Sequence, residues 1–202
     1  ADFIRPLLQK KCSAIDVGAG IGRIGSTLLK EKLGFEQVDL LEQEMSFLKA
    51  TQLKSASAAL ITDKTQSSNE KTAPEEVFRN LYCFPFQNFD FESNGLTYDL
   101  IWIQWCIIYL TDADFVTMLR RAASVLAPNG VLVIKDNISS TNKFYIDEQD
   151  YSITRTDNHL KVIFGGAGLK VKAEKIQTGF PKGLLPVKMY ALVKASEWSP
   201  TE

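Results

Sequence analysis

The stretch IDVGAGIGRIG, residues 15–25, decides the fold because it joins an apolar strand to a helix through a glycine-rich turn. The composition of Ser13–Val17 predicts a short buried strand, and apolar residues at helical spacing continue from Ile24 until Gly34 ends them. Glycine lacks the side chain that would obstruct a tight turn or the close approach of a ligand. The glycines concerned are Gly18, Gly20 and Gly22.

The alternation of strand and helix continues along the rest of the chain. We predict strands at residues 13–17, 35–42, 76–84, 98–104, 131–136, 170–177 and 186–194, and helices at residues 23–34, 45–60, 111–126 and 155–169. Repeated strand–helix units predict an α/β fold, a parallel sheet with helices on both faces, and the last two strands form an antiparallel pair. Ligands of such sheets bind beyond the carboxyl ends of the strands.

Composition places the chain among ordinary globular domains. Its 202 residues are 45% apolar and 23% charged, with a formal net charge of −1. This balance predicts a single domain over residues 1–202, with no general attraction to nucleic acid and no membrane-spanning segment. Residues 61–76 are polar and are expected to form a mobile insert. The three cysteines suit neither a disulfide framework nor a metal site, so no metal is expected.

A second informative stretch is YDLIWIQW, residues 98–105, in which an apolar strand ends on an amide and an indole. Gln104 and Trp105 would lie at the carboxyl end of a central strand, where a ligand can contact them. A capping amide and a core indole are the structural alternatives, and Trp102 fits the core better because it lies inside the strand.

An acidic residue ends the second strand. Glu42 follows Gly22 by 20 positions, a spacing that suits a carboxylate accepting the hydroxyls of a ribose. Both a dinucleotide and S-adenosylmethionine remain possible, since Gly20, Gly22 and Gly25 match the dinucleotide spacing. Asp16 just before the loop favours the cationic S-adenosylmethionine, because a carboxylate there repels a pyrophosphate.

Four segments together resemble the α-N-terminal protein methyltransferases, which methylate proteins that begin X-Pro-Lys or X-Pro-Arg. They are DVGAGIGR, IWIQW, LTDADFVTMLRRAASVLAPNGVLVIKDN and DEQDYSITR. The resemblance runs from Ile15 to Lys194, and IIYLTDADF is most similar to the kinetoplastid branch. It implies a Rossmann-like, seven-stranded class I methyltransferase sheet, S-adenosyl-L-methionine as donor and S-adenosyl-L-homocysteine as product.

By the same resemblance, individual residues acquire expected roles. The cofactor would be bound by Asp16, Gly18, Gly20, Arg23, Glu42, Phe86, Gln87 and Gln104. The substrate would be bound by Trp105, Asn137, Asp147, Asp150 and Ser152, with Asp150, Asn137 and Tyr109 as the catalytic group. Asp150 would take or relay the proton of the α-amine, and Trp105 would form a wall against the substrate's first residues.

The chain also departs from the family pattern. Tyr109 stands where animal and fungal members have a histidine, Leu185 stands where a tyrosine is common, and Gly183 replaces an acid. The family's N-terminal lid would precede the first residue of this sequence. The sole histidine, His159, is interpreted as a surface or packing residue.

We therefore expect an enzyme that methylates a protein or peptide N-terminus, acting as a monomer in the cytoplasm or nucleus. A small-molecule methyltransferase using the same glycine loop is the alternative. A non-catalytic cofactor-binding scaffold is a third hypothesis, and a dehydrogenase is disfavoured.

Overall fold

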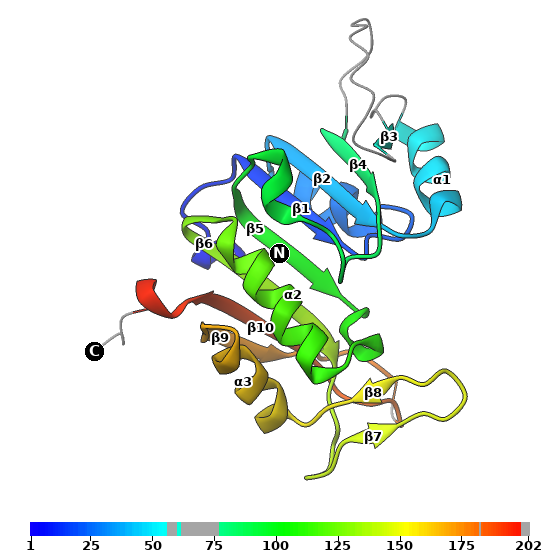
Figure 1. Ribbon diagram of the computed structural model, residues 1–202, viewed down its shortest axis with the longest axis vertical. Helices are drawn as coiled ribbons and strands as arrows, with labels where there is room; N and C mark the ends of the chain where they lie inside the picture. The colour runs from blue at the N-terminus through cyan, green and yellow to red at the C-terminus, as the bar shows by residue number, and fades with distance from the viewer. Residues whose placement is uncertain (56–59, 62–76, 182, 199–202) are drawn as a thin grey trace, which may run out of the picture.

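One sheet of eight strands runs through the computed structural model, which describes residues 1–55, 60–61, 77–181 and 183–198 (Figure 1). The strands are β1 (Ser13–Val17), β2 (Gln37–Glu42), β3 (Leu60–Ile61), β4 (Asn80–Cys83), β5 (Tyr98–Gln104), β6 (Leu126–Asn137), β9 (Leu169–Ile176) and β10 (Val187–Lys194). Their order is β3-β4-β2-β1-β5-β6-β10-β9. The first six in this order are mutually parallel, while β10 is antiparallel to both β6 and β9. The predicted fold class, including the C-terminal antiparallel pair, is confirmed.

Helices cover both faces of the sheet. The longer ones are the π-helix η2 (Ile24–Leu33) and the α-helices α1 (Met45–Ser55), α2 (Asp112–Ser124) and α3 (Asp157–Gly166). One apolar cluster joins Ile101 and Ile103 to α2 and α3, and another joins Leu100 and Trp102 to η2 and α1. Successive residues of β5 therefore point into opposite cores, which explains the unbroken apolar run from Leu100 to Ile103.

The helix ends follow the sequence signals. Thr111 caps α2 by accepting a hydrogen bond from the Asp114 N–H, and Thr156 caps α3 in the same way from His159. Gly34 ends η2 with a φ of 77°, a left-handed conformation that glycine adopts without strain. These caps confirm the predicted positions of the three helices.

The structure corrects several predicted boundaries. The helix expected over residues 45–60 ends at Ser55, and Leu60 instead begins β3, an eighth strand beside the seven predicted ones. Leu126, predicted as the last apolar residue of α2, is the first of β6, because its pairing with Tyr98 draws it into the sheet. The third strand is shorter than residues 76–84 because only Asn80–Cys83 pair with β2.

A two-stranded hairpin was not predicted. It consists of β7 (Tyr145–Ile146) and β8 (Ile153–Thr154), which pair antiparallel outside the main sheet. Strands of two residues leave no periodicity that a sequence pattern could reveal. The hairpin emerges from the end of β6 and projects from one end of the molecule (Figure 1).

The single-domain organisation stays a prediction. Of the expected mobile insert at residues 61–76, Ile61 belongs to β3 and the remainder lies outside the described residues. Every helix in the described part of the chain is too short or too polar to cross a bilayer.

A saturated polar network closes the amino-terminal ends of the strands. The fully buried Asp39 accepts hydrogen bonds from the Arg79 guanidinium on both of its carboxylate oxygens, 2.9 Å to Oδ1 and 2.5 Å to Oδ2. The Tyr98 hydroxyl donates to Asp39 Oδ2 at 2.8 Å, and Asn80 donates to Oδ1 at 3.0 Å. Each oxygen of this buried carboxylate is thus satisfied, as burial of a charge requires.

Candidate active site

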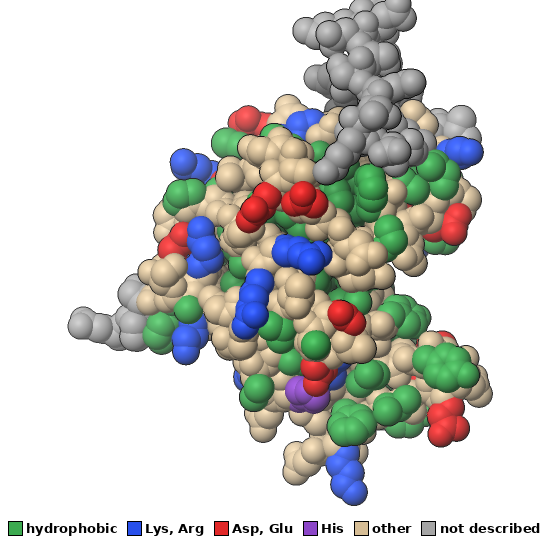
Figure 2. All heavy atoms as spheres, in the orientation of Figure 1, with side chains coloured by type: hydrophobic (Ala, Val, Ile, Leu, Met, Phe, Trp, Pro, Cys, Tyr) green, Lys and Arg blue, Asp and Glu red, His purple; other side chains and the backbone are tan. Residues whose placement is uncertain are grey.

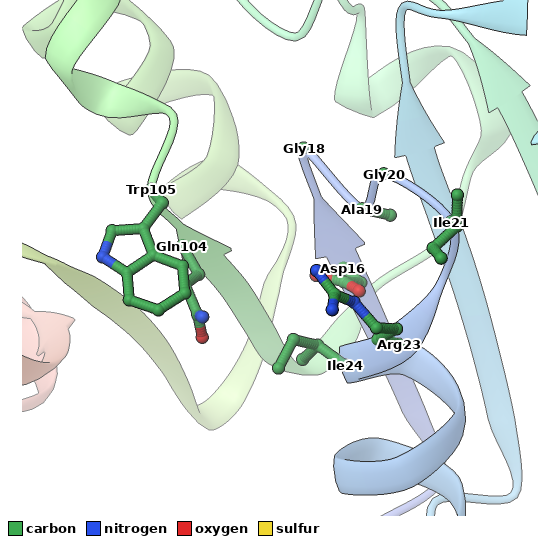
Figure 3. Close-up of a pocket in the computed structure, with 9 residues that line it drawn as sticks. All are labelled: Asp16, Gly18, Ala19, Gly20, Ile21, Arg23, Ile24, Gln104 and Trp105. Atoms are coloured by element: carbon green, nitrogen blue, oxygen red, sulfur yellow. The ribbon is translucent and has the colours of Figure 1, made fainter. Parts of the chain in front are cut away.

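The strand order reverses between β1 and β5, so the connections after these two strands run to opposite sides. In open α/β sheets this reversal opens a crevice beyond the carboxyl ends of the strands. A cavity of about 450 Å³ lies there, between the glycine loop after β1 and the end of β5 (Figure 3). The residues that line it are Asp16, Gly18, Ala19, Gly20, Ile21, Arg23, Ile24, Gln104 and Trp105.

The glycine loop is held against the end of β2 by backbone hydrogen bonds. Gly18 has a φ of 70°, and its N–H donates to the Leu41 carbonyl at 2.8 Å. A Cβ at this position would lie 2.9 Å from Cys106 Sγ, so any side chain would collide with the segment after β5. At Gly18 the loop therefore packs closely against Cys106, just after β5.

Asp16 lies at the end of β1, beneath the loop. Its carboxyl is almost completely buried, and Oδ2 accepts a hydrogen bond from the Gly25 N–H at 3.0 Å. Burial raises the pKa of Asp16 to about 7, against the opposing effect of the Gly25 hydrogen bond. A buried acid facing a cavity with so little compensation would gain from a cationic ligand, which would favour its ionised form.

Glu42 holds the loop from the end of β2. Its Oε2 accepts from the Gly20 N–H at 2.8 Å, and its Oε1 accepts from the Glu44 N–H at 2.9 Å. A carboxylate offers about four acceptor positions, so each oxygen retains capacity for a ligand hydroxyl. The predicted ribose contact of Glu42 stays a prediction, because this residue does not line the cavity.

Gln104 closes β5 with its amide orientation fixed. The Trp102 indole donates its Nε1–H to Gln104 Oε1 at 3.2 Å. Since the oxygen is held by this donor, the Nε2 group is left to donate hydrogen bonds into the cavity. An acceptor such as a carboxylate is the ligand group that matches it. Trp102 itself is buried, as predicted.

Trp105 has a backbone conformation that is rare for its residue type. Its φ is 53°, and its side chain is 44% exposed, with Lys135 Nζ 5.1 Å from the ring centroid. A bulky residue in the left-handed region costs roughly 1–3 kcal/mol and persists where the surrounding structure over-determines it. Figure 3 shows its ring on the opposite side of the cavity from the glycine loop and Arg23.

A second cavity, of about 560 Å³, shares Trp105 with the first. It is lined by Trp105, Ile108, Tyr109, Asn137, Phe180, Gly183, Leu184, Leu185 and Val187. The described lining residues carry no charged side chain, so the cavity favours an apolar or uncharged group. Trp105 lines both cavities, and they therefore meet at this ring.

The structure brings together part of the predicted site. The first cavity gathers Asp16, Gly18, Gly20, Arg23 and Gln104. The second gathers Tyr109 and Asn137, which lie at the ends of η4 (Ile107–Tyr109) and of β6. Phe86 and Gln87 follow β4, are half-buried and line neither cavity.

The residues of the predicted acidic group line neither of these two cavities. Asp147, Asp150 and Ser152 belong to the β7–β8 turn, where the Ser152 N–H donates to Asp150 Oδ1 at 2.9 Å. Hydrogen bonds from the side chain and backbone of Ser152 hold the pKa of Asp150 below its ordinary value. The same segment carries four exposed apolar side chains, those of Phe144, Tyr145, Ile146 and Tyr151. Figure 2 shows apolar side chains gathered at this end of the molecule.

Sequence reasoning missed Asp136, which precedes Asn137. Only 1% of this residue is exposed, and its Oδ2 is the one buried side-chain oxygen without a hydrogen-bond partner among the described residues. Burial raises the pKa of Asp136 to about 7, although the Asn137 N–H donates to its Oδ1 at 2.8 Å. The tripeptide KDN placed an acid here, but nothing in the sequence indicated its burial.

Comparison with known proteins identifies the family. Its sequence profile, described as AdoMet dependent proline di-methyltransferase, matches residues 2–193. The chain is 41% identical to alpha N-terminal protein methyltransferase 1 of Dictyostelium discoideum over 179 residues, which is 89% of this chain and 58% of that protein. It is 35% identical to the human N-terminal Xaa-Pro-Lys N-methyltransferase 1 over 179 residues, or 89% of this chain and 71% of that protein.

The fold comparison agrees with the sequence comparison. A SAM-dependent methyltransferase from Leishmania major aligns with a TM-score of 0.75 and 35% identity, covering 91% of this chain and 65% of that one. Because these identities do not single out the kinetoplastid protein, the branch stays a prediction. The chain spans about three fifths of the Dictyostelium relative's length. By profile, sequence and structure, this chain belongs to the α-N-terminal protein methyltransferase family.

Proposed function

We propose that this protein transfers a methyl group from S-adenosylmethionine to the α-amine of proteins that begin X-Pro-Lys or X-Pro-Arg. The observation that carries the proposal is that Trp105 lines both cavities, one with charged and polar side chains and one without charged side chains among its described lining residues. A donor in the first cavity and an amine in the second would face each other past this ring. The names of the Dictyostelium and human relatives support the same activity.

The residues of the first cavity fit S-adenosylmethionine, which supplies a methyl group already activated by a sulfonium. Asp16, a buried carboxyl with one hydrogen-bond donor to its Oδ2, matches the ammonium of the methionine portion. The Gln104 amide and the Arg23 guanidinium are donors that match its carboxylate. Glu42, at the end of β2, retains acceptor capacity for the ribose hydroxyls.

The second cavity fits the beginning of a polypeptide. The flat Trp105 ring offers an apolar face to a proline, and Asn137 offers donors and an acceptor to the backbone of a first residue. The acids of the β7–β8 turn match the Lys or Arg at the third position. Chain residues thus orient the amine and exclude water around it, which is the main demand of an in-line displacement.

The proton of the amine needs only modest assistance. An α-amine has a reference pKa of about 7.7–8.0, so a sizeable fraction is neutral at physiological pH. Asp150 is ionised at that pH because the ordinary pKa of an aspartate lies far below it, and Ser152 lowers the pKa of Asp150 further. We propose that Asp150 receives the proton through water, since its carboxyl is exposed and lines neither cavity. Tyr109 then orients the amine from the η4 side.

The decisive experiment follows methyl transfer to an Ala-Pro-Lys peptide and to the same peptide with an acetylated N-terminus. The proposal predicts transfer to the free amine and none to the acetylated one, although the lysine side chain is unchanged. Transfer to both peptides would place the methyl group elsewhere, and transfer to neither would contradict the proposal.

Asp150→Asn tests the role of the acidic turn. We expect the transfer rate to fall by about a hundredfold, within the range for loss of proton assistance, with cofactor affinity unchanged. Glu148→Gln is the matched control, since Glu148 is an exposed acid of the same turn. Equal rates for wild type and Asp150→Asn would remove Asp150 from the mechanism.

A small-molecule acceptor is the alternative that one observation favours. Leu184, Leu185 and Phe180 make the second cavity apolar, and Gly183 contributes no side chain. An apolar metabolite with a neutral nucleophile would fit this lining. Competition between the Ala-Pro-Lys peptide and a metabolite extract, both supplied with labelled donor, separates the two acceptors.

Two further expectations accompany the proposal. We propose that the protein acts as a monomer, which light scattering of the purified protein measures directly. We also propose a cytoplasmic or nuclear location, which fluorescence microscopy of the tagged full-length protein tests.

A further inference from the structure

We propose that Arg155 is a positioning residue that sets the shape of the second cavity. It would do so by holding η4 against the segments that follow β6 and β8. This inference rests on the proposed function, because it assigns the second cavity to the substrate. Arg155 lies directly after β8, and only 1% of it is exposed.

The guanidinium of Arg155 connects two elements that are distant in sequence. Its Nη1 donates to the Ile107 carbonyl at 3.2 Å, and its Nη2 donates to the Leu110 carbonyl at 2.5 Å. These two carbonyls bracket Ile108 and Tyr109, the residues that η4 contributes to the second cavity. Its Nε donates to Asp112 Oδ1 at 2.8 Å, which fixes the start of α2 as well.

The backbone of Arg155 extends the connection to the remaining walls. Its carbonyl accepts from the Ser139 N–H at 2.9 Å, two residues after Asn137. The neighbouring Ile138 N–H donates to the Pro186 carbonyl at 2.8 Å, beside Leu185. One residue therefore links η4, the end of β6 and, through Ile138, the segment before β10. All three contribute side chains to the cavity.

Burying a guanidinium carries a large desolvation penalty. It must satisfy its N–H groups inside the protein, and an apolar side chain of similar volume would avoid the desolvation penalty. The Arg155 guanidinium also lies 5.6 Å from the Phe115 ring centroid. The planar guanidinium spreads its donors over Nε, Nη1 and Nη2, which reach a carboxylate and two carbonyls at separate positions. A lysine ammonium presents all its donors from one atom and does not reproduce this geometry.

Arg155→Lys keeps the charge but loses the fork. We expect the KM for an Ala-Pro-Lys peptide to rise about tenfold, the equivalent of one lost hydrogen bond to a charged group. We expect kcat to change less than KM, and the dissociation constant for S-adenosylhomocysteine to stay within about twofold. Arg120→Lys is the matched control, because Arg120 is exposed and donates to a single carbonyl, that of Gly166.

Two further variants keep the inference testable if Arg155→Lys does not fold. Asp112→Ala removes the carboxylate that the Arg155 Nε contacts, and the Asp112 side chain is 50% exposed. Asp112 also contacts His159 Nε2 at 2.7 Å, so His159→Gln reports the loss of that second contact alone. The inference predicts a raised KM for Asp112→Ala and an unchanged KM for His159→Gln. Equal KM values for these two variants and the wild type would overturn it.

Hydrogen exchange tests the positioning without using activity. Arg155→Lys should speed exchange together in residues 106–111 and 137–141, and leave residues 13–25 unchanged. Unchanged exchange in the first two segments would overturn the inference even if the wild type methylates peptides. If the wild type methylates none, the proposed function fails while the exchange result still decides the role of Arg155.

Discussion

The buried carboxylates at the two ends of the sheet differ in how many hydrogen-bond donors contact them. At the amino-terminal ends, Asp39 has a bidentate partner in Arg79 and further donors from Tyr98 and Asn80. At the carboxyl-terminal ends, Asp16 has one donor to its Oδ2, and Asp136 has an oxygen without a described partner. The saturated end stabilises the fold, and the unsaturated end leaves polar groups available to a ligand.

The largest expected difference between the two ends is between the variants Asp39→Asn and Asp16→Asn, each of which replaces a carboxylate by the corresponding amide. Asp39→Asn leaves the partly buried Arg79 without its countercharge, and we expect the free energy of unfolding to fall by roughly 3–5 kcal/mol. Asp16→Asn removes a buried acid whose ionisation is disfavoured by burial, so stability at neutral pH should be maintained or rise while affinity for S-adenosylmethionine falls. Denaturant unfolding and calorimetric titration measure the two effects. The contrast is lost if both variants lose the same stability.

A substitution at Gly18 tests the carboxyl-terminal end of the sheet by changing the backbone of the glycine loop. Gly18→Ala places a methyl group against Cys106 Sγ and strains a φ of 70°, so we expect cofactor affinity to fall by about a hundredfold. Gly95→Ala is the control, because Gly95 has a φ of 64° but no atom within 4 Å of an added Cβ. Similar affinities for the two variants would show that the collision at Gly18 does not weaken cofactor binding, and would contradict the prediction.

Stability should depend on pH through Asp16 and Asp136. Both have a folded-state pKa of about 7, above the ordinary value of 3.8, so the folded protein binds more protons between these values. The free energy of unfolding should therefore fall as pH rises from about 4 to about 7, by at most about 1.4 kcal/mol per unit for each acid. Asp136→Asn should flatten the slope. A slope identical to that of the wild type would contradict this assignment.

The smallest expected effect concerns the orientation of Gln104. Trp102→Phe removes the indole N–H that holds Gln104 Oε1, so the amide can turn either way. Cofactor affinity should fall by several-fold, about 1 kcal/mol for one neutral hydrogen bond. Calorimetric titration of S-adenosylmethionine measures the change, with Trp198→Phe as a control near the other end of the chain. Unchanged affinity would mean that the amide is oriented by something else.

Much of this arrangement could be predicted because its signals are local. The spacing of Gly18, Gly20 and Gly22 after an apolar strand predicted the loop, and the apolar run before Gln104 predicted the strand that places Trp105. The caps at Thr111 and Thr156 likewise depend on neighbours in sequence. Such features follow from short-range geometry, which the order of residues specifies directly.

The remaining features depend on contacts between distant residues. The Arg155 guanidinium contacts carbonyls 45 and 48 residues away, and no sequence pattern links these positions. The burial of Asp136 and the positive φ of Trp105 result from packing of the completed sheet. The β7–β8 hairpin has strands too short to show periodicity, so the sequence could not show that Asp150 lies in a hairpin turn and lines neither cavity.

The most direct test asks whether the two cavities communicate past Trp105. A compound that joins the sulfur position of S-adenosylhomocysteine to the α-amine of an Ala-Pro-Lys peptide by a short linker would occupy both at once. Its dissociation constant should be at least about a hundredfold lower than that of the tighter component alone, because the second binding event becomes intramolecular. A dissociation constant no lower than that of the tighter component would contradict a donor and an acceptor that meet at this ring.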